Sequence, residues 1–84
     1  MRAVVRVLLK PNVPDMHGAA VKSSLQLSGF SQIRDIRYGR LFQLDLDLSR
    51  EEAAQQLEGM CQKLLANTLI EDYEWEIINV SNSK

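Results

Sequence analysis

The chain contains one histidine, His17, and one cysteine, Cys61, so a nucleophilic pair is the first chemistry that its residue types suggest. A cysteine nucleophile needs a base such as histidine within hydrogen-bond distance. Cys61, however, falls on the apolar stripe of a predicted helix, where a free cysteine behaves as a small hydrophobic residue. His17 falls in the first turn of another predicted helix, where exposed histidines are commoner than catalytic bases. We interpret both as structural, and together they supply no zinc-binding spacing.

Carboxylates are the other candidates for chemistry. Asp45 and Asp47 lie two residues apart on one face of a predicted strand, a spacing that a hydrolase or a hard-metal site could use. No third ligand is close in sequence, so the polar outer face of a half-buried strand is the better interpretation. A second acidic group either discourages aggregation at a sheet edge or docks a basic partner surface. This group comprises Glu71, Asp72, Glu74 and Glu76.

The composition of the 84 residues is typical of a globular protein, with 45% hydrophobic and 25% charged residues. We expect a single domain spanning residues 1–84. Ten basic and eleven acidic residues give a net charge of −1, which argues against nucleic acid as a partner because phosphate backbones require a positive surface. So small a core has a thin stability margin, and a single cysteine cannot form an internal disulfide. Oligomerisation is the expected supplement.

The first apolar run, residues 3–9, is interrupted by Arg6 and followed by Lys10 and Pro11. It is too short to span a membrane, and it lacks the small-residue cleavage pattern of a secretory signal. A lone cysteine fits a reducing compartment. These features predict a cytoplasmic protein without membrane association.

Hydrophobic periodicity predicts four strands and two helices in the order strand, helix, strand, strand, helix, strand. The expected strands cover residues 3–9, 33–38, 42–48 and 73–77, and the expected helices cover 15–28 and 50–65. Two such split units without a linker favour an α+β, ferredoxin-like βαββαβ fold. In this fold a four-stranded antiparallel sheet is covered by two helices on one face.

Several residues mark the expected ends of these elements. Ser49 and Glu52 form a capping box at the start of the second helix. Gly29 and Asn67 are placed to end the two helices in the left-handed conformation, and Gly39 with Arg40 forms the expected hairpin turn. The apolar stripe of the first helix comprises Ala20, Val21 and Leu25. That of the second helix comprises Ala53, Leu57, Met60, Cys61, Leu64 and Leu65.

The sheet face that the helices leave uncovered is expected to combine charged and apolar side chains. If the first and last strands are neighbours, Glu74 and Glu76 lie near Arg2 and Arg6 and offset their charges. The apolar residues expected on this face are Val4, Leu8, Leu41, Ile78 and Val80. Because such a face is more apolar than solvent requires, we interpret it as a surface for self-association.

Residues 64–73, together with residues 18–21 and 37–40, resemble the PurS family, the small subunits of phosphoribosylformylglycinamidine synthase. The resemblance covers essentially the whole chain and is densest in residues 64–73. Met16 stands where the family usually has proline, and Arg40 replaces the usual lysine, which keeps the charge but changes the donor geometry.

The resemblance implies a subunit that is not catalytic by itself but is required by a glutamine-dependent, ATP-consuming ligase complex of de novo purine biosynthesis. Such a subunit joins a glutaminase subunit to a large synthetase subunit and supports ammonia transfer between them. It implies a homo-oligomer, as a dimer or a dimer of dimers. It also implies that this chain binds no cofactor or metal, since ATP, magnesium and glutamine are used by the partner subunits.

The residues expected to contact or shape a partner interface sit at turns and element ends, where a small domain meets its neighbours. They are Arg37, Gly39, Arg40, Asn67, Glu71 and Asp72. For Gly39 and Asn67 a role confined to turn geometry is the competing interpretation.

The main alternative function is a regulatory domain that binds an amino acid or another small effector. It shares the element order and would use residues 10–18, where two prolines stiffen the chain and Gly18 permits close backbone approach. This segment lacks the repeated glycines and lysine of a phosphate-binding loop. An RNA-binding module fits less well, because the aromatic residues of the strands are in phase with buried positions.

Overall fold

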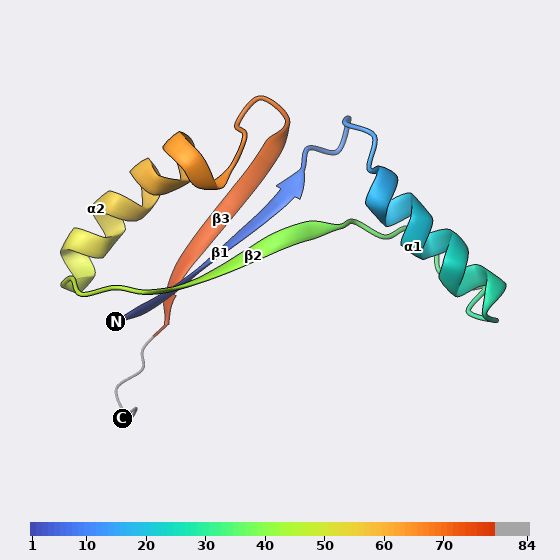
Figure 1. Ribbon diagram of the computed structural model, residues 1–84, viewed down its shortest axis with the longest axis horizontal. Coiled ribbons are helices and arrows are strands. Elements are labelled where there is room, and N and C mark those ends of the chain that lie inside the picture. Colours follow the sequence, from blue (N-terminus) through green and yellow to red (C-terminus); the bar gives the residue numbers. More distant parts are fainter. Residues whose placement is uncertain (79–84) are drawn as a thin grey trace.

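The computed structural model describes residues 1–78, which form a larger and a smaller part joined by a thin neck (Figure 1). The elements are strands β1 (Arg2–Leu9), β2 (Gly39–Asp45) and β3 (Glu71–Ile78), helices α1 (Met16–Leu27) and α2 (Arg50–Met60), and the π-helix η1 (Cys61–Leu65). The larger part contains the sheet, α2 and η1 (Figure 1). The smaller part contains α1 and residues 28–38, the return segment that leads from α1 back to β2.

The sheet has three antiparallel strands in the order β2-β1-β3, with the most apolar strand in the centre. Val5 of β1 lies opposite Phe42 of β2 and Trp75 of β3. Alternation along β1 turns Ala3, Val5 and Val7 toward α2, and each is at most 1% exposed. The predicted first and last strands are confirmed, because period-two patterns in these segments match the observed faces.

The predicted four-stranded sheet is wrong, because the described residues contain three strands. The predicted second strand, residues 33–38, has no strand beside it. These residues precede β2 instead of pairing with it as a hairpin. Because Leu8 lies opposite Gly39 and β1 ends at Leu9, they extend beyond the sheet. The predicted hairpin turn at Gly39 and Arg40 is also wrong, since these residues begin β2.

Helix α2 forms and packs as its sequence predicts. The Ser49 hydroxyl accepts a hydrogen bond from the Glu52 amide at 3.2 Å, and the Glu52 carboxylate accepts one from the Ser49 amide at 3.0 Å. This capping box satisfies amides that the first helical turn leaves without partners. Ala53, Leu57 and Cys61 are fully buried against the sheet and form the core with β1.

The helix widens into η1 over its last turn, which the sequence pattern did not predict. The Ala66 amide donates to the Cys61 carbonyl at 3.0 Å, across five residues rather than four. The extra residue in the turn moves Leu64 away from the apolar stripe, so its predicted burial is wrong and it is 83% exposed. The chain then leaves the helix at Ala66 in an extended conformation. Asn67 is not left-handed, since no non-glycine residue of the described chain has a positive φ.

Helix α1 begins and ends where predicted. The Asp15 carboxylate caps its start by accepting from the Gly18 amide at 2.8 Å. At its end Gly29 has φ 106°, and the Phe30 amide donates to the Leu25 carbonyl at 3.0 Å. This arrangement is a Schellman motif, which uses glycine because a side chain strains the positive φ.

Helix α1 nevertheless does not cover the sheet, so the predicted placement of both helices on one face is wrong (Figure 1). Ala20 is exposed and Val21 is 42% exposed, although both belong to its predicted buried stripe. The helix packs instead beside its own return segment, where a Cβ on Gly18 would collide with the Ile36 carbonyl. The radius of gyration is 16.3 Å, whereas a compact chain of this length has about 12 Å.

The uncovered face of the sheet carries ion pairs as predicted for Arg6. Its guanidinium lies 3.3 Å from the Glu74 carboxylate and 2.7 Å from that of Glu76. Leu8 and Leu41 on this face are 43% and 61% exposed. Self-association through this face stays a prediction.

Other residues expected on that face differ in exposure. Val4 is only 5% exposed; it lies in the central strand, opposite Gln43 on one side and Glu76 on the other. Ile78 is half-buried, and Val80 lies outside the described residues.

Candidate functional site

The six residues expected at a partner interface gather at one end of the sheet, where β1 stops and β2 and β3 begin. Leu8 lies opposite both Gly39 and Asp72, and Leu9 lies opposite Glu71. We call this group the sheet-end cluster. Its members are Arg37, Gly39, Arg40, Asn67, Glu71 and Asp72.

Glu71 connects two other members of the cluster. Its carboxylate accepts from the Arg40 guanidinium at 2.6 Å and from the Asn67 amide at 2.7 Å. The Glu71 side chain is only 15% exposed, whereas that of Arg40 is 48% exposed and lies over the Phe42 ring. A charge-assisted bond on a mostly covered carboxylate fixes its position. The guanidinium keeps a surface open to solvent or to a partner.

Asn67 organises the turn that leads into β3. Its side-chain oxygen accepts from the Leu69 amide at 3.1 Å, and its carbonyl accepts from the amides of Ile70 and Glu71. These bonds are those of an Asx-type turn. Asn67 therefore has a clear role in turn geometry, and a contact with a partner stays a prediction.

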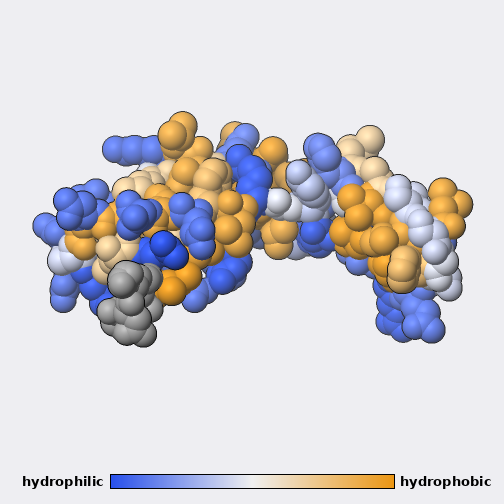
Figure 2. Space-filling view, turned by 60° about the horizontal axis from the view of Figure 1, so that its bottom comes forward, coloured by the Kyte–Doolittle hydropathy of each residue, from blue (hydrophilic) through white to orange (hydrophobic). Residues whose placement is uncertain are grey.

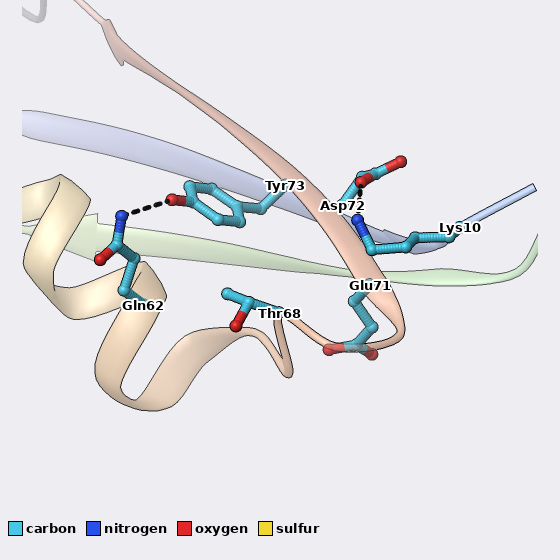
Figure 3. A pocket seen from close by; sticks show the side chains of 6 residues that line it. All are labelled: Lys10, Gln62, Thr68, Glu71, Asp72 and Tyr73. Atoms are coloured by element: carbon cyan, nitrogen blue, oxygen red, sulfur yellow. Dashed lines mark hydrogen bonds and ion pairs between the residues drawn. The ribbon is translucent and has the colours of Figure 1, made fainter.

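Asp72 lies beside an open hollow between η1 and the start of β3 (Figure 3). The Lys10 ammonium pairs with the Asp72 carboxylate at 2.8 Å on one side of it. Gln62 donates to the Tyr73 hydroxyl at 3.4 Å on the other side. The hollow has a volume of about 570 Å³ and presents both donors and acceptors. Such a lining suits polar contacts with another surface.

The side chain of Arg37 binds groups of its own chain near Asp15, where α1 begins. We call this start of the helix the root of α1. The Arg37 guanidinium donates to the Leu9 carbonyl and lies 3.9 Å from the Asp15 carboxylate. Asp15 also accepts from the Tyr38 amide at 2.8 Å. The Tyr38 and Gly18 amides, with a smaller contribution from Arg37, lower the pKa of Asp15 below its ordinary value. This network fixes the direction in which α1 leaves the sheet.

Gly39 is required by the close approach of β1. A Cβ at this position would collide with the Val7 carbonyl oxygen and lie 2.5 Å from a Leu8 methyl carbon. Any side chain here therefore displaces the start of β2. The sequence predicted Gly39 in a hairpin turn, whereas the structure places Gly39 at the first position of β2.

A second hollow of about 480 Å³ lies between the root of α1 and the sheet end. Met16, His17, Tyr38, Arg40 and Glu71 contribute to its wall. The rings of His17 and Tyr38 stack with centroids 4.6 Å apart. His17 thus belongs to this wall, whereas Cys61 is fully buried in the core, so the two form no nucleophilic pair.

Sequence reasoning missed Glu58, which joins α2 to β3. Its carboxylate accepts from the Tyr73 hydroxyl, from the Trp75 indole at 3.1 Å and from Gln62 at 3.0 Å. The Tyr73 hydroxyl contributes most to lowering the pKa of Glu58, and the carboxylate in turn raises the pKa of Tyr73. No sequence spacing indicates this group, because its aromatic members are 15 and 17 residues away.

Two further expectations concern metals and membranes. Among residues 1–78, no three His, Cys, Asp or Glu side chains are grouped so as to hold a metal ion. Asp45 and Asp47 are both exposed, and Asp45 lies opposite Arg2. In the same range, neither helix has the length and apolar character needed to cross a membrane.

With this geometry established, comparisons with known proteins identify the family. The sequence model of the PurS family, described as phosphoribosylformylglycinamidine (FGAM) synthase, matches residues 2–79. The chain belongs to the PurS family. The resemblance recognised in residues 18–21, 37–40 and 64–73 is thereby confirmed, and PurS proteins are subunits of FGAM synthase.

Individual relatives agree over most of the chain. The PurS subunit of Synechocystis is 45% identical over 74 residues, which are 87% of this chain and 74% of the relative. The PurS structure from Bacillus subtilis is 36% identical with a TM-score of 0.83, covering 93% of this chain and 98% of that one. A chain in PurLQS from Thermotoga maritima, 23% identical with a TM-score of 0.81, shares the fold over 92% and 95% of the two chains.

Proposed function

We propose that this chain is a non-catalytic subunit of the FGAM synthase complex that bridges the glutaminase and ATP-dependent synthetase subunits. In that position it supports the transfer of ammonia between them during de novo purine biosynthesis. Membership of the PurS family is the observation that carries this proposal. The Thermotoga relative, which has the same fold, is part of PurLQS, and this supports a role within an assembly.

The chemistry of the described residues suits a positioning role. A subunit that aligns two reaction centres and excludes water accelerates a reaction without supplying an acid, base or nucleophile. In this proposal ATP, magnesium and glutamine are bound by the partner subunits. The chain acts in the cytoplasm as a homo-oligomer, either a dimer or a dimer of dimers.

The sheet-end cluster is the surface that we assign to a partner subunit. Asp72 presents an exposed carboxylate beside the polar hollow, and Arg40 presents a half-exposed guanidinium beside the second hollow. Charges of this kind steer association and fix the register of two surfaces more than they add affinity. The cluster can therefore align the partner, while apolar contacts elsewhere stabilise the complex.

Reconstitution with the two partner subunits tests the bridging role. FGAM synthesis is measured with glutamine and, separately, with ammonium as the nitrogen source, each with and without this chain. We expect removal of the chain to abolish glutamine-driven synthesis and to leave most of the ammonia-driven synthesis. Equal loss of both activities contradicts a role in transfer, and no loss of either contradicts the proposed function.

A charge exchange tests the sheet-end cluster separately. Arg40→Glu should weaken co-sedimentation with the partners, whereas Arg34→Glu, in the exposed return segment, is the matched control. The double variant Arg40→Glu with Glu71→Arg restores the internal pair with reversed polarity. If Arg40 contacts a partner, the double variant regains stability but not assembly. Full assembly by Arg40→Glu would remove this residue from the interface.

The second hollow favours one other function, the binding of a small effector by residues 10–18. Its wall includes Pro14, Met16 and His17 from this segment, with Tyr38 stacked on the histidine. Calorimetric titration of the isolated chain with amino acids and nucleotides tests this alternative. A saturable heat with a defined stoichiometry supports effector binding, and its absence leaves the bridging role as the better account.

A further inference from the structure

The polar hollow between η1 and the start of β3 has paired charges at one end and uncharged polar groups at the other (Figure 3). The Lys10 ammonium and the Asp72 carboxylate lie 2.8 Å apart at the charged end. Gln62 and the Tyr73 hydroxyl form the other end, and Thr68 lies between the two ends. The volume of about 570 Å³ falls within the roughly 300–1,000 Å³ of small-molecule sites.

The ion pair of the polar hollow can exchange partners at little cost. The side chains of Lys10 and Asp72 are 35% and 59% exposed. A pair so exposed contributes little to stability, because water competes for both charges. Neither residue takes part in another ion pair within residues 1–78. A ligand that carries both kinds of charge can therefore replace this pair with two new ones.

The remaining charge of the lining is already neutralised. The Glu71 carboxylate accepts from the Arg40 guanidinium at 2.6 Å, so Lys10 and Asp72 are the charges left for a ligand. An anion bound to Lys10 would lie beside the Asp72 carboxylate, and a cation bound to Asp72 would lie beside the Lys10 ammonium. A zwitterion satisfies both groups, because each of its charges meets the opposite one.

The uncharged end of the hollow suits a polar side chain. The Gln62 amide nitrogen donates to Glu58 at 3.0 Å and to Tyr73 at 3.4 Å, which leaves the Gln62 oxygen as an acceptor. The Thr68 hydroxyl can both donate and accept.

The described lining contains no Leu, Ile, Val or Met side chain. Apolar side chains gather instead over the part of the molecule that contains α1 (Figure 2). The polar hollow therefore selects its ligand by charge and hydrogen bonding.

We propose that the polar hollow binds a free α-amino acid whose side chain carries an amide or a hydroxyl group. The α-carboxylate of the ligand binds the Lys10 ammonium, and its α-ammonium binds the Asp72 carboxylate. The side chain of the ligand extends toward Thr68 and Gln62. This site is separate from the second hollow, and the inference does not rest on the bridging role.

NMR titration of the ¹⁵N-labelled full chain tests the site, with glutamine as the probe. We expect saturable shifts of the amides of Lys10, Thr68 and Asp72. The dissociation constant should be about 1 mM, because a small ligand in an open hollow makes few contacts. Shifts that do not saturate, or that are confined to residues 14–17, overturn the inference.

Two analogues test which groups of the ligand are recognised. N-acetylglutamine lacks the α-ammonium charge and should bind at least about tenfold more weakly than glutamine. Leucine keeps both charges but has an apolar side chain, so it should bind about fivefold more weakly. If either analogue binds as tightly as glutamine, the assigned ligand class is wrong.

Variants of the chain locate the ligand. Lys10→Met and Asp72→Asn should each weaken glutamine binding at least about tenfold. Lys63→Met removes an exposed lysine of η1 that does not line the hollow, and it is the matched control with unchanged affinity. Unfolding midpoints equal to that of the unmodified chain show that the variants fold. Unchanged affinity in Lys10→Met and Asp72→Asn overturns the inference.

A last variant distinguishes the two hollows. His17→Ala alters the wall of the second hollow and should leave glutamine binding unchanged. Loss of binding in His17→Ala alone would place the ligand in the second hollow and overturn the inference. Because all these titrations use the chain without partner subunits, their failure leaves the reconstitution test of the bridging role unaffected.

Discussion

The two helices of this chain are nearly equal in length and both are capped by their own side chains, yet only one is covered. α2 has 11 residues and buries Ala53 and Leu57, whereas α1 has 12 residues and buries only Gly18. The difference shows that caps determine where a helix begins and ends but not what it packs against. A short connection brings α2 back over the sheet, while the Asp15 network directs α1 away from it.

The sharpest test of this contrast compares a leucine from each helix. Leu57→Ala should lower the free energy of unfolding by about 2–5 kcal/mol, because it leaves a cavity under α2. Leu27→Ala should change the stability of a single chain by less than about 0.5 kcal/mol, since Leu27 contacts solvent there. Urea denaturation followed by circular dichroism measures both. A cost for Leu27→Ala that appears only at high protein concentration would locate its contacts in a second copy.

The next largest effect is expected at the root of α1. Asp15→Asn keeps a good helix cap but removes the charge that faces Arg37 and the Tyr38 amide. We expect faster amide exchange throughout α1 and unchanged exchange in α2. Similar acceleration in both helices would show that the root supports the whole fold instead.

Acid should have the same effect on the unmodified chain. The pKa of Asp15 is lowered in the folded state, so its contribution is complete above the ordinary value of 3.8 and is lost as pH falls through the folded value. The NMR shifts of α1 amides should therefore change below about pH 4. In Asp15→Asn this change should be absent, which distinguishes it from titration of Glu58.

A smaller effect is expected from the cap of α2. Ser49→Ala removes the hydroxyl that accepts from the Glu52 amide and should cost about 1 kcal/mol. Ser31→Ala, at an exposed position in the return segment, is the control and should cost almost nothing. Equal unfolding midpoints for the two variants would show that the cap is not needed once α2 is packed.

The smallest change in stability is expected from a substitution on the uncovered face of the sheet. Arg6→Gln removes both of its ion pairs, but the three side chains are 43–70% exposed and water screens their charges. The unfolding midpoint should hardly move, and the difference should vanish at high salt. A large shift would mean that this face is covered in solution.

Local patterns in the sequence predicted the elements whose ends and faces are set by neighbouring residues. The alternation in β1 and β3, the Ser49 capping box and the glycine at the end of α1 are of this kind. The predicted strand at residues 33–38 was wrong because a strand also needs a partner strand. Alternation of apolar residues does not show where β1 ends. The predicted burial of Leu64 was wrong because the periodicity of an α-helix does not reveal a π-helical turn.

The candidate site was predictable to the extent that it lies at element ends. Arg40, Glu71 and Asn67 each lie at an expected element end, and the structure joins them through the Glu71 carboxylate. The internal role of Arg37 was not predictable, because its partner Asp15 is 22 positions away and belongs to another element. Glu58 was missed for the same reason.

The burial of the only cysteine supplies a kinetic reporter that needs no added label. Cys61 is fully buried beneath the end of α2, and burial raises the pKa of its thiol. A thiol reagent can modify it only when that region opens, so the modification rate counts opening events. If a partner subunit closes over the sheet end, modification of Cys61 will slow on assembly. The modification rate in the complex then reports the lifetime of the closed assembly.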